Sequence, residues 1–94
     1  MQHSPAAQSV AVVGLGYVGL PLAVALAEAS FQVIGLDADY SKVAALEDNE
    51  PYLEGVTSER LEPLLTSGLL RSTRNYSALE EAETVILCLP TPLD

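Results

Sequence analysis

The stretch VAVVGLGYVGL, residues 10–20, decides how this chain folds. Its first four residues are apolar and three of them are β-branched, which is typical of a short strand buried on both faces. Residues 14–19 then read Gly-x-Gly-x-x-Gly, and the alanine- and leucine-rich segment 20–29 follows. We therefore predict a strand, a glycine turn and a helix that tolerates Pro21 in its first turn. The helix ends near Ser30, where glycine or asparagine would better adopt the left-handed conformation that closes a helix.

The three glycines have separate expected tasks in such a turn. Gly14 permits the tight change of direction, Gly16 lets a pyrophosphate approach the backbone, and Gly19 lets the helix lie close to the sheet. The free N–H groups and the positive end of the helix dipole would hold the phosphates without any lysine. The pattern alone is a weak signal, but its place between a buried strand and a helix predicts a dinucleotide site.

Asp37 supplies the second half of this prediction. It ends the next apolar strand, residues 32–36, and follows Gly19 by 18 residues, close to the spacing of about 20 that dinucleotide-binding units show. A carboxylate there can accept hydrogen bonds from the 2′-hydroxyl of the adenine ribose. Asp37 and Asp39 would repel a 2′-phosphate and no arginine is adjacent, which favours NAD over NADP. Lys42 is the one cation nearby.

Strands and helices alternate along the rest of the chain, in the order β-α-β-α-α-β-α-β. This order predicts an α/β fold, namely a Rossmann-type doubly wound parallel sheet with right-handed crossovers and strand order 3-2-1-4. The remaining expected elements are a helix from the N-cap Asp39 through Asp48, a loop over 49–56, a helix from the N-cap Ser58 through Ser67 with Gly68 as terminator, a strand over Leu70–Thr73, a brief helix with a capping box of Ser77 and Glu80, and a strand over Thr84–Leu89.

The end of the last strand is a second candidate site. In this strand order the fourth strand lies beside the first, and the ligand crevice opens between their carboxyl ends. Residues 89–92 read Leu-Pro-Thr-Pro, and the Thr91 hydroxyl can reach the nicotinamide side of a cofactor there. Cys88 precedes this segment in an apolar run and has no His or Lys neighbour that would favour a thiolate. We therefore interpret Cys88 as a core residue.

Composition limits the classes of function. The chain has 94 residues, which we divide into a loose tail, residues 1–8, and the amino-terminal part of one domain, residues 9–94. The net charge is −9 and the four basic residues are scattered, which argues against nucleic acid as a partner. The single cysteine excludes an intrachain disulfide and favours a cytoplasmic protein. The uncharged stretch 10–27 holds glycines and a proline and follows no Lys or Arg, so we predict no membrane span; we also predict no metal site.

With these residues in place, the chain resembles the UDP-glucose/GDP-mannose dehydrogenase family, above all its UDP-N-acetyl-glucosamine and UDP-N-acetyl-mannosamine 6-dehydrogenases. The resemblance covers residues 9–94 and is carried by segments 10–23, 35–43 and 88–93. It implies a parent enzyme of polysaccharide biosynthesis that oxidises the C6 alcohol of a UDP-sugar to a carboxylate. The implied route takes two NAD-dependent steps through a thiohemiacetal and a thioester. The implied cofactor-binding residues are Gly14, Gly16, Tyr17, Val18, Gly19, Asp37, Lys42 and Thr91.

The nucleophilic cysteine and the other catalytic groups of that family lie well beyond residue 94, so we expect no catalytic residue in this chain. Ser30 and the loop 51–56 depart from the family pattern. Two alternatives remain: a non-enzymatic nucleotide-binding module of Rossmann type, and another NAD-dependent dehydrogenase of 2-hydroxy-acid or 6-phosphogluconate type. The pairing of Tyr-Val-Gly with Pro-Thr-Pro counts against the latter. The strand over 84–89 would form an apolar sheet edge, which predicts self-association.

Overall fold

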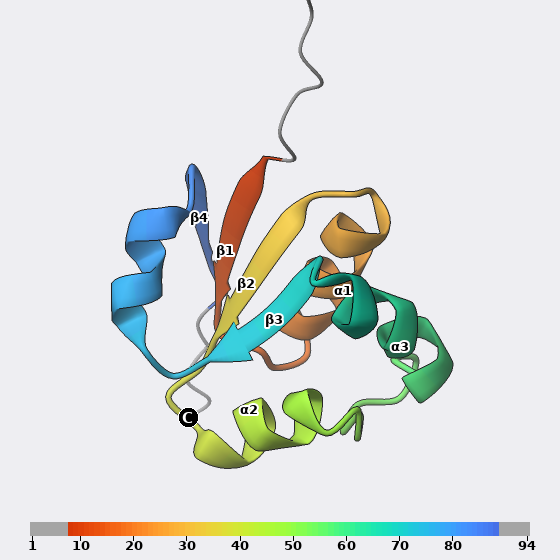
Figure 1. Ribbon diagram of the computed structural model, residues 1–94. Coiled ribbons are helices and arrows are strands. Elements are labelled where there is room, and N and C mark those ends of the chain that lie inside the picture. The colour runs from red at the N-terminus through yellow and green to blue at the C-terminus, as the bar shows by residue number, and fades with distance from the viewer. Residues whose placement is uncertain (1–7, 89–94) are drawn as a thin grey trace, which may run out of the picture.

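A computed structural model describes residues 8–88, which form one parallel sheet with helices on both faces (Figure 1). The strand order is β3-β2-β1-β4, and each neighbouring pair is parallel. This confirms the predicted fold class and the predicted order 3-2-1-4. In chain order the elements are β1 (Ser9–Val13), α1 (Gly19–Glu28), β2 (Gln32–Leu36), α2 (Tyr40–Glu47), α3 (Ser58–Ser67), β3 (Leu70–Thr73), the 3₁₀-helix η1 (Tyr76–Glu81) and β4 (Thr84–Leu87).

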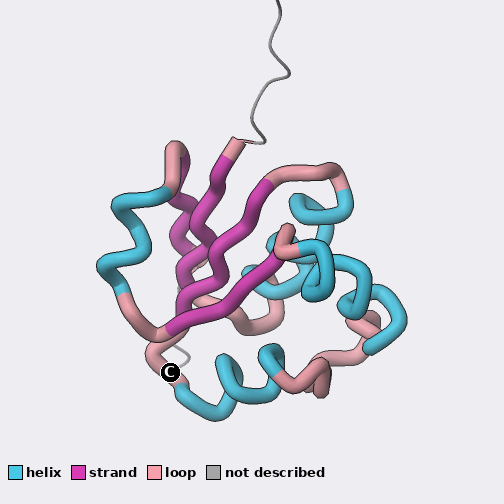
Figure 2. Tube along the Cα trace, viewed as in Figure 1, coloured by secondary structure: helices cyan, strands magenta, loops and turns pink. Residues whose placement is uncertain are grey.

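The register of the sheet brings the candidate site together. β1 lies between β2 and β4, and Val13 at its end pairs with Leu36 on one side and with Leu87 on the other. Parallel strands end at the same edge of a sheet, so Gly14, Asp37 and Cys88, which follow these strands, lie next to one another. Figure 2 shows the loops that gather at this edge.

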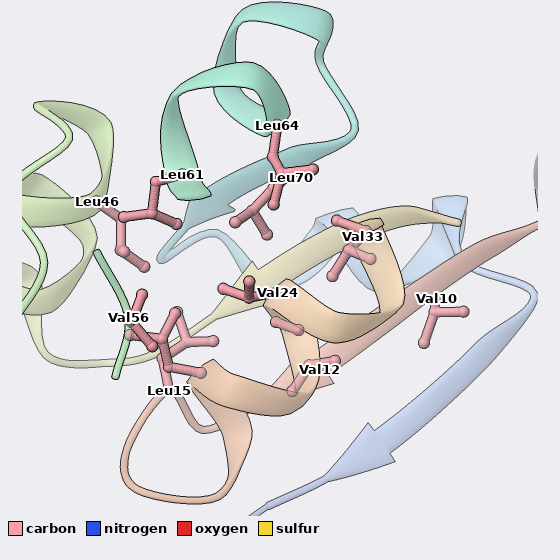
Figure 3. Close-up of a cluster of buried hydrophobic side chains, with 13 residues drawn as sticks. Val10, Val12, Leu15, Val24, Val33, Leu46, Val56, Leu61, Leu64 and Leu70 are labelled. Atoms are coloured by element: carbon pink, nitrogen blue, oxygen red, sulfur yellow. The ribbon is translucent and has the colours of Figure 1, made fainter. Parts of the chain in front are cut away.

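The sheet buries its two faces unequally. Val12 belongs to the larger cluster of buried side chains, on the face covered by α1, while Val13 belongs to the smaller cluster under η1. Strand residues alternate between the faces because successive side chains of a strand point in opposite directions. Figure 3 shows the larger cluster between the strands and the helices. Its members are Val10, Val12, Leu15, Leu20, Ala23, Val24, Ala27, Val33, Leu46, Val56, Leu61, Leu64 and Leu70.

Two predicted helix starts are wrong by one or two residues. The N-cap of α3 is Thr57, whose Oγ1 accepts a hydrogen bond from the Arg60 amide at 3.2 Å, and Ser58 is already helical. The last helix has no capping box of Ser77 and Glu80. Its N-cap is Asn75, whose Oδ1 accepts from both the amide and the hydroxyl of Ser77. In both cases a nearby residue with a side-chain oxygen acceptor has the extended backbone of an N-cap and takes the capping role.

The other predicted helix ends are confirmed. Asp39 caps α2 by accepting a hydrogen bond from the Ser41 amide, and Gly68 closes α3 with a φ of 82°. Ser30 follows α1 with a φ of 77°, so a serine occupies the left-handed conformation that glycine would adopt more readily.

The sheet edge formed by β4 is apolar and exposed. Val85 is 44% exposed and Leu87 is 66% exposed. The strand ends at Leu87, and Leu89, which we expected to end it, lies outside the described residues, as do Thr91 and residues 1–7 of the predicted tail. Within the part of the chain that the structure describes, no helix has the length and apolar character needed to cross a membrane.

Candidate dinucleotide-binding site

The glycine turn joins β1 to α1, where the sequence predicts it. Gly14 has a φ of 100°, and its amide donates to the Leu36 carbonyl at 2.7 Å. A Cβ on Gly14 would lie 2.3 Å from the carbonyl oxygen of Cys88. Both the conformation and the close approach of β4 therefore require glycine at this position.

Gly19 is required for a different reason from the one predicted. A Cβ on Gly19 would lie 1.6 Å from the carbonyl oxygen of Gly14 and 3.3 Å from the Cβ of Cys88. The close approach is thus to the turn itself and to the residue after β4. Because the nearest atom belongs to the backbone, no side-chain movement could make room for a larger residue.

Gly16 is different again. Its φ is not in the left-handed region, and the only atom that the built Cβ would meet within 4 Å is the Nζ of Lys42, at 4.0 Å. Nothing in residues 8–88 therefore demands glycine at position 16. A bare backbone there leaves room for a group from outside the chain.

The start of α1 offers amides without acceptors. The N–H groups of residues 16–19 donate to no acceptor within residues 8–88, and the N-cap Val18 makes no side-chain capping bond. Tyr17 is 88% exposed and Val18 is 68% exposed, so solvent reaches this turn. Unpaired amides at the positive end of a helix dipole form an anion-binding site.

Asp37 points at the glycine turn. Its Oδ2 accepts a hydrogen bond from the Leu15 amide at 2.8 Å, and its Oδ1 accepts one from the Asp39 amide at 2.8 Å. The carboxylate is 14% exposed, and Lys42 Nζ lies 3.9 Å from its Oδ2. The structure therefore brings together Gly16, Asp37 and Lys42, three of the residues that the sequence predicts for the cofactor. Each carboxylate oxygen retains a lone pair for a further donor.

Tyr52 belongs to this site, and the sequence analysis missed it. Its hydroxyl donates to the carbonyl oxygen of Leu15 at 2.6 Å, from a loop 37 residues away in the chain. Burial and the negative charges of Asp37 and Asp39 raise the pKa of Tyr52 above its ordinary value, so the hydroxyl remains a proton donor. The predicted loop gave no sign of this contact beyond its one aromatic residue.

Arg74, which the sequence analysis did not single out, lies at the strand end next to that of Asp37. β3 pairs with β2, and the Asp37 amide donates to the carbonyl of Thr73 at 3.4 Å, so Arg74 follows at the neighbouring strand end. Its guanidinium lies 4.9 Å from the centroid of the Tyr40 ring. A hollow of about 380 Å³ opens beside it, lined by Ala38, Arg74, Asn75 and Tyr76. Arg74 is distant from Asp37 in sequence, and pairing of the strands brings it near.

Cys88 is half-buried and packs against the larger cluster, as predicted for a core residue. Its amide donates to the Val13 carbonyl at 2.7 Å, which continues the pairing of β4 with β1. Cys88 therefore holds the end of β4 against the glycine turn.

These residues fit a dinucleotide. A pyrophosphate requires a bare backbone and amides that point at it, and Gly16 with the unpaired amides of residues 16–19 provides both. A ribose requires a hydrogen-bond acceptor at the end of β2, and Asp37 provides it. Lys42 adds a positive charge beside Gly16 in an otherwise acidic chain.

Comparisons with known proteins identify the same kind of domain. Residues 8–94 match the NAD binding domain of the UDP-glucose/GDP-mannose dehydrogenase family. A UDP-N-acetyl-D-mannosamine dehydrogenase of Methanococcus aeolicus is 37% identical over 84 residues, which cover 88% of this chain and 18% of that protein. An uncharacterized protein of Methanocaldococcus jannaschii is 42% identical over 90 residues, which cover 92% of this chain and 10% of that protein. The solved structure of a UDP-D-ManNAc dehydrogenase from Pyrococcus horikoshii matches with a TM-score of 0.85 at 31% identity, over 93% of this chain and 21% of that one.

The fold and the glycine turn define an α/β domain that binds a dinucleotide. The chain belongs to the UDP-glucose/GDP-mannose dehydrogenase family and matches its NAD-binding domain, so its cofactor is NAD. It spans between a tenth and about a fifth of the length of the curated relatives that it matches.

Proposed function

We propose that this chain is the NAD-binding part of a nucleotide-sugar 6-dehydrogenase, and that the whole enzyme oxidises the C6 alcohol of a UDP-sugar to a carboxylate with two NAD. The relatives named as UDP-N-acetyl-D-mannosamine dehydrogenases support a UDP-sugar as the substrate. When bound, NAD supplies the hydride acceptor. The catalytic groups belong to parts of the enzyme that residues 1–94 do not include, so this chain alone binds the cofactor and oxidises nothing.

The geometry of the site supports the following proposed cofactor contacts. The amides of residues 16–19 donate to the pyrophosphate, and Lys42 adds a positive charge beside Gly16. Asp37 accepts a hydrogen bond from the 2′-hydroxyl of the adenine ribose with the lone pairs that its two backbone contacts leave free. The adenine lies toward the hollow beside Arg74.

Three further proposed contacts rest mainly on the family resemblance. Tyr17 and Val18 flank the cofactor from the exposed side of the turn. Thr91, outside the described residues, lies on the nicotinamide side.

The uncapped start of α1 is the observation that carries this proposal. A helix start without a side-chain cap leaves its amides for a ligand, whereas a capped start has already used them. The glycine at position 16, which neither conformation nor packing within residues 8–88 requires, indicates that the ligand lies directly against this backbone.

Gly16→Val tests the proposal. A Cβ at position 16 meets only the flexible end of Lys42, so we expect the substitution to leave the fold of the turn intact. Calorimetric titration with NAD should show at least about tenfold weaker binding, since the branched side chain displaces the pyrophosphate from the amides. The matched control Thr66→Val, at an exposed position of α3, should bind NAD like the wild type. Wild-type protein that fails to bind NAD, or a Gly16→Val variant that binds it equally well, would contradict the proposal.

We also propose that residues 9–94 form one domain preceded by a tail, and that the isolated chain self-associates through β4. The exposed Val85 and Leu87 on an unpaired strand edge support pairing with a second copy. Sedimentation velocity over a range of concentrations should show dimers that Leu87→Lys abolishes. A wild-type chain that stays monomeric throughout would disprove the association.

The family resemblance supports a role in polysaccharide biosynthesis, and the single cysteine supports a cytoplasmic location.

A further inference from the structure

The peptide that joins Leu15 to Gly16 is held from several sides. The Leu15 amide donates to Asp37 Oδ2 at 2.8 Å, and the Leu15 carbonyl accepts the Tyr52 hydroxyl at 2.6 Å. The Leu15 side chain is fully buried, and it fills the space above Gly35, where a Cβ would lie 3.0 Å from Leu15 Cδ2. Residue 15 is therefore held by its amide, its carbonyl and its side chain, whereas Tyr17 and Val18 of the same turn are exposed.

Peptide geometry turns this constraint into an orientation for the next amide. In a trans peptide the C=O of one residue and the N–H of the next point in opposite directions. When Tyr52 binds the Leu15 carbonyl, the N–H of Gly16 must point away from Tyr52. That N–H is the first of the amides that have no acceptor within residues 8–88.

We propose that Tyr52 is a positioning residue of the NAD site, which holds the Leu15 carbonyl back and so aims the Gly16 amide at the pyrophosphate. A flip of the same peptide would present the carbonyl oxygen to the phosphate, and two negative groups would then face each other. Tyr52 excludes that arrangement before the ligand arrives. This inference rests on the proposed function, because it assigns a task within the same phosphate site.

The chemistry of Tyr52 suits this task. Its ring is half-buried and packs against the larger core cluster, so the loop carries it in a fixed place. The hydroxyl is the only part of the side chain that touches the glycine turn through a hydrogen bond. Tyr52→Phe therefore removes the orienting contact and keeps the packing.

The test compares ligands with and without a pyrophosphate. Tyr52→Phe should bind NAD and ADP about tenfold more weakly than the wild type, a loss typical of one hydrogen bond with its acceptor left unpaired. Adenosine, followed by NMR titration, should bind both proteins within twofold of each other. The matched control Tyr40→Phe, whose ring is exposed and lies under Arg74, should leave all three affinities unchanged.

A ligand-free measurement separates orientation from general loosening. In ¹⁵N-edited spectra, Tyr52→Phe should broaden or shift the Gly16 amide resonance and leave that of Gly68, at the end of α3, unchanged. Wild-type affinity of Tyr52→Phe for ADP would overturn the inference and leave the NAD site intact. Equal losses for ADP and adenosine would overturn it too, because they would indicate a structural role. Failure of the wild type to bind ADP or NAD would instead refute the proposed function itself.

Discussion

Two strand-to-helix junctions lie side by side at the carboxyl edge of the sheet, and they are built in opposite ways. At the start of α2, Asp39 accepts hydrogen bonds from the amide and the hydroxyl of Ser41. At the start of α1, Val18 stands in the same position and caps nothing. The two junctions share one side chain, because Asp37 accepts from the Leu15 amide with Oδ2 and from the Asp39 amide with Oδ1.

The difference shows what makes a helix start into a binding site. Both helices begin at the carboxyl edge of the sheet, yet a carboxylate already occupies the start of α2. Thr57 and Asn75 occupy the starts of α3 and η1 in the same way. Among the helices of residues 8–88, only α1 lacks a side-chain cap, so the absence of a capping side chain selects it for an anion.

The largest expected effect comes from adding a side chain to the α1 junction. Gly19→Ala places a Cβ 1.6 Å from the Gly14 carbonyl oxygen, and this backbone clash should cost more than about 4 kcal/mol. A domain of this size has a stability of roughly 5–14 kcal/mol, so folding is lost or severely weakened. Urea unfolding followed by circular dichroism measures the change.

Gly16→Ala is the matched control for that substitution, since position 16 has space, and it should change stability by less than about 1 kcal/mol. A Gly19→Ala variant that unfolds at the wild-type midpoint would show that the turn is not closed as described.

The next effect comes from removing the side chain that both junctions share. Asp37→Ala leaves the amides of Leu15 and Asp39 without their acceptor and should cost about 1–3 kcal/mol, together with most of the NAD affinity. The losses of stability and of NAD affinity for Asp37→Asn should lie between zero and those of Asp37→Ala. The asparagine side chain keeps one oxygen that can accept a hydrogen bond, whereas its NH₂ group cannot accept one. Unfolding curves and NAD titrations of the two variants test this order. Equal losses for the two substitutions would mean that an acceptor oxygen at position 37, shared by the amides of Leu15 and Asp39, contributes nothing measurable.

A smaller effect is expected at the other end of α1. Ser30→Gly relieves a φ of 77° and should stabilise the chain by about 1 kcal/mol without changing NAD affinity. Asn49→Gly is the contrasting control. Asn49 also has a positive φ, but its side chain donates to the Ser58 carbonyl at 3.2 Å, so its loss should destabilise the chain. Thermal unfolding of both variants should give shifts of opposite sign, and a lower melting temperature for Ser30→Gly would disprove the strain.

The smallest effect concerns acid and the α2 junction. Hydrogen bonds from the Ser41 hydroxyl and amide lower the pKa of Asp39 below its ordinary value. A lowered pKa in the folded state means that the carboxylate adds stability above about pH 4, the ordinary value, and that this contribution is lost as the pH falls through the folded pKa. Asp39→Asn keeps a side-chain cap that does not titrate. Its midpoint of urea unfolding should therefore fall less between pH 7 and pH 3 than that of the wild type. Parallel pH profiles for the two proteins would contradict this.

The sequence predicts the fold and the glycine turn because both depend on neighbouring residues. Alternating apolar runs define the strands, and the spacing from Gly14 to Asp37 defines the unit. Tyr52 and Arg74 could not be predicted, because only the folding of a loop and the pairing of β3 with β2 bring them to the site. Ser58 was wrongly predicted as the N-cap of α3 in place of Thr57, because either hydroxyl can cap a helix and the local backbone decides.

The most direct test of the account compares the two junctions in one experiment. ¹⁵N-edited spectra of the wild-type chain, recorded while NAD is added, report each backbone amide separately. The account predicts the largest shifts for residues 16–19 at the start of α1 and much smaller ones for Ser41 and its neighbours at the start of α2. Shifts centred on α2, or no shifts at residues 16–19 at saturating NAD, would contradict the claim that the uncapped helix start is the phosphate site.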